Sequence, residues 1–143
     1  MKLGSDRIDI GNCNFLTNKL RPYLGYTILN VPALKLLGTT EFIPFEILDK
    51  KKVIPEYIRY LLLSTDYLKK SKFLMSGKEH PRIMPTDILN IQVSLPSYRV
   101  QEKIIKEIQT KELESEKARE NIKKYRDQIN QIITKELDRL EKE

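Results

Sequence analysis

The chain has 143 residues, which is enough for one globular domain, or for a smaller domain with an added element. Its formal net charge is +6, and its single cysteine, Cys13, excludes an internal disulfide. No apolar run approaches the roughly 20 residues that a membrane helix needs, and no charged-then-apolar leader stands at the start, so a cytoplasmic protein with no membrane partner is expected.

The positive charge is unevenly divided along the sequence. Residues 1–100 carry 15 Lys and Arg against 9 Asp and Glu, whereas residues 101–143 carry 11 of each sign. An excess of cations confined to one part of a chain is typical of a surface that contacts a nucleic-acid backbone. A mildly basic domain is also common without that role, so charge alone leaves both interpretations open.

Two short strands are predicted first, at residues 13–16 and 26–29, because both stretches are rich in aromatic and branched side chains. The segment between them presents Lys19, Arg21 and Tyr23, and the proline after Arg21 favours an extended backbone there. Guanidinium groups hydrogen-bond phosphates or guanine edges and rings pack on sugars or bases, so this segment is a candidate DNA contact. The alternative is a basic connection between strands with its tyrosine half buried.

A strand near residues 42–47 and two helices are predicted next. Pro55 is suited to the first position of a helix, and its apolar face comprises Tyr57, Ile58, Leu61 and Leu62. Thr65 is the expected cap of a second helix that runs to Met75. The outer face of this second helix carries Lys69, Lys70 and Lys72.

Residues 78–85 form a second unusual loop, which two prolines hold extended. It presents Lys78, His80 and Arg82. A lone histidine near a helix end is usually solvated or hydrogen-bonded, and without another His or a Cys cluster no metal site is expected. After this loop, Thr86 or Asp87 caps a single helical turn, a strand follows at residues 91–95, Pro96 breaks it, and Ser97 caps a long helix.

The last stretch, from Gln101 to about Leu140, contains no Pro and no Gly and is predicted to be one long helix. About 40 residues at about 1.5 Å each would extend roughly 60 Å, more than one face of a small domain can cover. Its apolar residues recur three or four apart and lie on one stripe, which is therefore predicted to pair with another helix. The helix-pairing residues are Ile122, Tyr125, Ile129, Ile133, Leu137 and Leu140. The alternative is a long amphipathic helix packed only on its own domain.

Together these elements predict an α+β fold, with a small mixed α/β domain at residues 1–97 and a long coiled-coil helix at residues 98–143. The glycines are scattered singly, so no phosphate-cradling loop is present, and there is no nucleophile elbow or metal-ligand spacing. No catalytic residues and no cofactor are expected. A binding module is favoured over an enzyme.

Five segments occur in order along the chain: NKLRPYL at residues 18–24, GTTEFI at 38–43, SGKEHPRI at 76–83, DILNIQVSLP at 87–96 and QEKI at 101–104. Together they resemble the DNA specificity subunit of type I restriction-modification systems. The turn and strand that end in Leu-Pro and open into a long helix are the most characteristic part. The order and spacing agree over roughly residues 11–140.

The resemblance implies a target recognition domain of mixed α/β structure that reads one half of a split DNA site, followed by a spacer helix. A full subunit of that family has two such domains in inverted repeat, with its helices packed antiparallel, and it recruits methyltransferase (modification) subunits and then restriction subunits. The partner would be double-stranded DNA. The recognition-domain residues that the resemblance suggests as DNA contacts are Lys19, Arg21, Tyr23, Thr39, Thr40, Lys78, His80 and Arg82.

Two departures from the family pattern shape the expectation. The chain has one recognition unit where the family usually has two, which implies a half-subunit that pairs with itself or with a second half through its helix. A symmetric pair would read a palindromic split sequence. The amino-terminal part of the domain also looks short, so the alternative is a truncated coiled-coil assembly or competitor protein that binds subunits but not DNA. An enzyme that transfers methyl groups or cleaves DNA is a more distant alternative.

Overall fold

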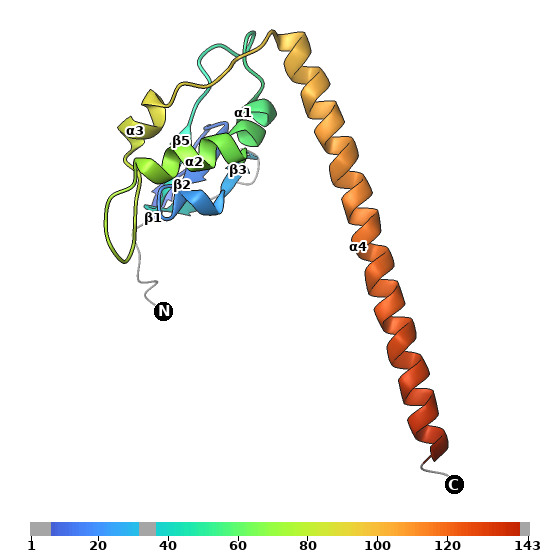
Figure 1. Cartoon of the computed structure of the whole chain (residues 1–143). Coiled ribbons are helices and arrows are strands. Elements are labelled where there is room, and N and C mark those ends of the chain that lie inside the picture. The colour runs from blue at the N-terminus through green and yellow to red at the C-terminus, as the bar shows by residue number, and fades with distance from the viewer. Residues whose placement is uncertain (1–6, 32–36, 141–143) are drawn as a thin grey trace. The chain divides into compact units, whose positions relative to one another are not determined.

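The computed structural model describes residues 7–31 and 37–140 (Figure 1). Strands and short helices come first, and one long helix, α4 (Tyr98–Leu140), follows them. The chain divides into two compact units, Met1–Ile105 and Lys106–Glu143, so the first turns of α4 belong to the first unit. The predicted α+β class with a long carboxy-terminal helix is confirmed.

A three-stranded antiparallel sheet lies at the centre of the first unit. Its middle strand, β2 (Phe15–Asn18), pairs with β3 (Thr27–Leu29) on one side and with β5 (Phe42–Phe45) on the other. A separate antiparallel ladder joins β1 (Arg7–Asp9) to β4 (Leu37–Thr39). The strands expected near residues 13, 26 and 42 are all present, with boundaries shifted by one or two residues.

Successive side chains of β2 point to opposite faces of the sheet, so this one strand contributes to two cores. Phe15 stacks on Phe45 of β5, with ring centroids 5.2 Å apart. The larger core comprises Phe15, Ile47, Leu62 and Tyr67, and the smaller core comprises Ile10, Cys13 and Leu16. The middle strand is therefore buried on both sides. It sets the position of Lys19, the first residue of the segment that follows it.

Two helices, α1 (Pro55–Leu62) and α2 (Thr65–Phe73), cover the Phe15 face of the sheet (Figure 1). The predicted start of α1 at its proline is confirmed. The predicted cap of α2 is wrong by one residue, because Ser64 has an extended backbone and its hydroxyl oxygen accepts from the N–H of Tyr67 at 3.3 Å.

The segment after α3 (Pro85–Asn90) departs most from the sequence analysis. The helix begins after Met84 with no side-chain cap, so the expected capping by Thr86 or Asp87 is wrong. Residues 91–97 form neither helix nor strand, so the predicted strand there is wrong as well. This segment is held by side chains of other elements and not by hydrogen bonds to a neighbouring strand. The Tyr57 hydroxyl, for example, donates to the Ser94 carbonyl at 3.0 Å.

One buried amide joins the start of α4 to the first unit. Gln101 is 0% exposed, and its Oε1 accepts from the N–H of Ile54 at 3.0 Å. Its Nε2 donates to the carbonyls of Lys52 at 2.8 Å and Pro96 at 2.9 Å. All three partners are backbone groups from the segments that precede α1 and α4, so one side chain connects those segments.

We expect Gln101→Met to destabilise the first unit by at least about 2 kcal/mol, because the buried amide loses three hydrogen bonds that each contribute about 0.5–1.5 kcal/mol. Methionine has a similar volume, so the loss reports the hydrogen bonds and not a cavity. Urea unfolding measures the change, and Gln109→Met on the exposed part of α4 is the matched control. A loss no larger than that of the control would contradict this role for the Gln101 amide.

Candidate nucleic-acid interface

The segment that contains Lys19 lies between two other parts of the chain. The N–H of Lys19 donates to the carbonyl of Glu41 at 2.9 Å, and the carbonyl of Lys19 accepts from the N–H of Ile83 at 3.0 Å. Glu41 lies in the turn between β4 and β5, and Ile83 lies in the second predicted loop, residues 78–85. Three segments that the sequence singled out separately are thus joined by backbone hydrogen bonds.

Arg21 does not have the extended backbone that the following proline predicts. Its φ of 48° and ψ of 57° are left-handed, and among the described residues it is the one non-glycine with a positive φ. Such a conformation costs about 1–3 kcal/mol. In it, the N–H of Arg21 donates to the Pro81 carbonyl at 2.8 Å and its own carbonyl accepts from the N–H of Leu24 at 2.9 Å, which closes the short turn η1 (Pro22–Leu24). These contacts to the folded chain override the local preference.

The second predicted loop is closed at its base. Ser76 and Arg82 exchange two backbone hydrogen bonds of 2.9 and 2.8 Å, which leaves residues 77–81 as the tip. Gly77 has a φ of +100°, and a Cβ there would lie 3.2 Å from the carbonyl oxygen of His80, so the turn needs a glycine. Lys78 and His80 are exposed on the tip. The guanidinium of Arg21 donates to the carbonyl of Glu79 at 3.4 Å, which links the two loops again.

A bidentate ion pair holds this second loop against the turn between β4 and β5. Arg82 donates from Nη2 to one Glu41 carboxylate oxygen at 2.7 Å and from Nε to the other at 3.1 Å. A third donor, Nη1, contacts the carbonyl of His80 at 3.1 Å. The hydrogen bond from Arg82 lowers the pKa of Glu41 below its ordinary value. In this conformation Arg82 positions the loop, and its guanidinium already has protein partners.

We call the surface formed by residues 19–23 and 77–82 the loop surface. Of the predicted contacts, Arg21, Tyr23, Lys78 and His80 are exposed on it, and Lys19 and Arg82 are partly buried in it. Thr40 borders it next to Glu41 in the turn, and Thr39 lies in β4 opposite Arg7. The structure therefore brings the predicted residues of the two loops together.

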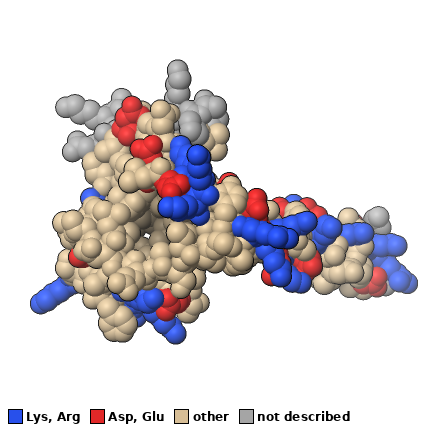
Figure 2. Space-filling view, turned by 90° about the horizontal axis from the view of Figure 1, so that it is seen from above, with Lys and Arg blue, Asp and Glu red and all other residues tan. Residues whose placement is uncertain are grey.

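Charge is distributed differently on the two units. Figure 2 shows Lys and Arg side chains in separate groups on the first unit and interleaved with Asp and Glu along α4. Ion pairs in the first unit join Asp49 to Lys52, Asp66 to Lys70 and Glu41 to Arg82. Each pair uses one cation and one carboxylate, so the excess of cations in the first unit is unchanged by these pairs.

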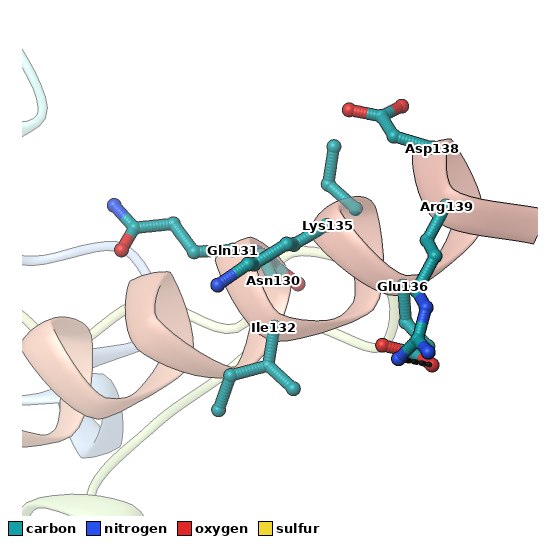
Figure 3. Close-up of a pocket in the computed structure, with 8 residues that line it drawn as sticks. Asn130, Gln131, Ile132, Lys135, Glu136, Asp138 and Arg139 are labelled. Carbon is teal, nitrogen blue, oxygen red and sulfur yellow. Dashed lines mark ion pairs between the residues drawn. The ribbon is translucent and has the colours of Figure 1, made fainter. Parts of the chain in front are cut away.

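The predicted pairing stripe of α4 is uncovered. Each of its members is more than half exposed: Ile122, Tyr125, Ile129, Ile133, Leu137 and Leu140. A shallow hollow on the same helix is lined largely by polar side chains, among them Asn130, Lys135 and Asp138 (Figure 3). Every residue that lines this hollow belongs to α4, so it is open surface and not an enclosed ligand site.

Comparison with known proteins identifies no relative, since neither a protein-family model nor a curated protein matches the chain. Among residues 7–31 and 37–140, no group of three or more His, Cys, Asp or Glu side chains is placed to hold a metal ion. None of the helices described combines the length and the apolar character needed to cross a membrane.

Two residues important to this region were not given a role by the sequence analysis. Glu41 belongs to the GTTEFI segment, but its partner Arg82 is 41 positions away and no local pattern connects them. Gln101 opens the QEKI segment, but a glutamine at a helix start is usually exposed, and nothing nearby in sequence predicts its complete burial.

We expect Glu41→Gln to loosen the loop surface, because the neutral amide cannot form the charge-assisted pair with Arg82. The readout is amide hydrogen exchange at Arg21 and Ile83, whose N–H groups join the two loops, and severalfold weaker protection is expected in the variant. The exposed Glu46→Gln is the matched control.

The same ion pair gives a pH dependence. The folded pKa of Glu41 is lowered, so its carboxylate stabilises the folded loop surface fully above the ordinary glutamate pKa of about 4.3. This stabilisation is lost as the pH falls through the folded pKa. Protection factors of the wild type should therefore approach those of Glu41→Gln as the pH falls from about 4.3 through the lowered folded pKa. If the wild type kept protection factors well above those of Glu41→Gln in acid, the assigned ion pair between Glu41 and Arg82 would be contradicted.

Proposed function

We propose that the chain is a non-catalytic DNA-recognition protein, a half-subunit of the kind found as the specificity component of type I restriction-modification systems. The observation that carries this proposal is the junction at Lys19, where backbone hydrogen bonds unite the two cation-bearing loops that the family resemblance singles out. The cytoplasm is the proposed location.

The loop surface has the chemistry that duplex recognition needs. An exposed guanidinium at Arg21, an ammonium at Lys78 and a ring at Tyr23 stand on loops that are fixed by backbone hydrogen bonds. Cations of this kind bind phosphates, and an arginine can also donate two hydrogen bonds to guanine. The left-handed backbone of Arg21 adds support, because strained residues are found preferentially at functional sites.

The long helix supplies the proposed means of assembly. An exposed apolar stripe on a helix of balanced charge fits pairing with a second copy or a second half-subunit, and it fits recruitment of methyltransferase and then restriction subunits. In a symmetric pair, each recognition unit would read one half of a split palindrome, and the helix length would set the separation.

The alternative function is a truncated coiled-coil assembly or competitor protein that binds these subunits but not DNA. The observation that favours it is Arg82, a predicted DNA contact whose guanidinium is held by Glu41 and by the His80 carbonyl. Under this alternative the loop surface is a structural remnant and only α4 has partners.

The DNA proposal is tested by affinity for duplex DNA at several salt concentrations. We expect Arg21→Gln to cost about 1–3 kcal/mol and to relax sequence preference, and Lys19→Gln to weaken all sequences alike and lower the salt slope by about 1. Lys124→Gln on α4 removes one charge as a control and should change neither. Wild-type affinity that does not respond to salt would contradict the proposal and favour the alternative.

The pairing proposal is tested by the mass in solution, measured by light scattering. We expect Ile129→Asp with Ile133→Asp to convert an associated protein into a monomer, because two carboxylates would be buried in the apolar seam. Gln131→Asp with Thr134→Asp places the same charges off the stripe and should leave association intact. A stripe variant that stays associated would refute this assignment of the interface.

A further inference from the structure

The exposed apolar stripe of α4 has a spacing that is the same in both directions. Its six residues follow one another at intervals of 3, 4, 4, 4 and 3 positions: Ile122, Tyr125, Ile129, Ile133, Leu137 and Leu140. Its ends are 18 positions apart, which is five turns of about 3.6 residues, so the stripe runs straight along the helix. Residues 109–121 have only Leu113 and Ala118 as apolar residues, so the stripe is confined to residues 122–140.

This symmetric spacing makes the stripe complementary to itself when two copies lie antiparallel. One register then places every stripe residue level with a stripe residue of the other copy: Ile122 with Leu140, Tyr125 with Leu137, and Ile129 with Ile133. A two-fold axis passes level with residue 131. Such a contact uses the same surface on both copies, so it closes as a dimer.

Two charged residues border the stripe and obey the same symmetry. Arg126 lies four positions after one stripe residue and three before the next, and Glu136 lies three after one and four before the next. Residues at these spacings share a helix face. In the antiparallel register, Arg126 of each copy is level with Glu136 of the other, which gives two pairs of opposite charge. On its own helix Glu136 contacts Arg139 at 3.8 Å, a long and exposed pair that contributes little (Figure 3).

A parallel pair lacks this complementarity. In register, every residue lies beside its own copy, so Arg126 would meet Arg126 and Glu136 would meet Glu136, and like charges disfavour association. A parallel pair shifted by ten positions would join the opposite charges, but it would place Ile129 beside Arg139 and lose the two-fold symmetry. The antiparallel register does place Lys123 level with Arg139, but neither has a stripe residue three or four positions away, so both lie off the seam.

We propose that the stripe binds a second copy of this chain as an antiparallel pair, with residues 122–140 of the two copies in contact. The proposal rests on the pairing through α4 in the proposed function, and it adds the partner, the orientation and the register. Six apolar residues of each copy would leave water, and two ion pairs would flank them. The polar residues 109–121 would stay outside the contact.

Disulfide cross-linking of the full chain tests the orientation. We expect Ile122→Cys chains mixed with Leu140→Cys chains to cross-link on oxidation, and neither variant to cross-link alone. In an antiparallel pair of one variant the added thiols would be about 27 Å apart, far beyond the reach of a disulfide. Lys124→Cys mixed with Asp138→Cys is the matched control, because these positions are level but face away from the seam. The wild type, whose cysteine is buried, reports unintended cross-links.

Charge reversal tests the register. Arg126→Glu and Glu136→Arg should each weaken the dimer roughly tenfold, because each places like charges level across the seam. The two changes on one chain should restore wild-type affinity, since opposite charges then meet again. A parallel pair would show no such restoration. The dissociation constant of the full chain is measured by light scattering over a range of concentrations.

The outcomes separate this inference from the proposed function. A wild type that stays a monomer at every concentration overturns the inference together with the proposed pairing, while DNA affinity tests recognition independently. An associated wild type in which Ile122→Cys cross-links alone overturns the antiparallel orientation. Failure of the mixed chains to cross-link, or of the double charge reversal to restore affinity, overturns the register. In these last cases the proposed pairing through α4 stands.

Discussion

The candidate interface depends on the backbone of one residue, Lys19. Its N–H and carbonyl bond to Glu41 and to Ile83, so the chain that leaves the central strand is held between two distant turns. The Glu41 carboxylate then fixes Arg82, and the Arg21 N–H fixes Pro81. Cations that look independent in the sequence are therefore presented by a single hydrogen-bonded unit. Such pre-organisation lowers the entropy that binding must overcome.

The fold could be predicted where the signal is local. Pro55 begins α1 as expected, and the stretch without Pro or Gly is one helix from Tyr98 to Leu140. The second helix was expected to run to Met75, and α2 ends two residues earlier, at Phe73. A helix boundary or a long uninterrupted helix depends on residues within a few positions of each other, so sequence patterns reveal it.

The remaining features depend on contacts between distant residues. Arg21 is left-handed because it bonds to Pro81, although the proline beside it favours an extended backbone. Residues 91–95 have apolar and branched side chains but pair with no strand within residues 7–31 and 37–140, so they do not form a ladder there. Glu41 pairs with Arg82, 41 positions away, and the buried Gln101 amide bonds to Lys52 and Ile54, nearly 50 positions away. No local pattern encodes any of these partners.

The two units make different demands on the sequence. The first unit concentrates its positive charge and buries its apolar side chains around the central sheet, whereas the second balances its charges and leaves its apolar stripe in water. This division suits a protein whose first unit binds a polyanion and whose helix binds another helix.

Hydrogen exchange of the full chain, with and without a duplex at low salt, tests the central claim most directly, because it maps DNA onto individual backbone amides. The expected result is slower exchange on DNA in residues 19–23 and 77–82, with little change in the core strands, which are protected already. Protection confined to α4, or no protection at any salt at which DNA is bound, would contradict the assignment of the loop surface as the DNA-binding site.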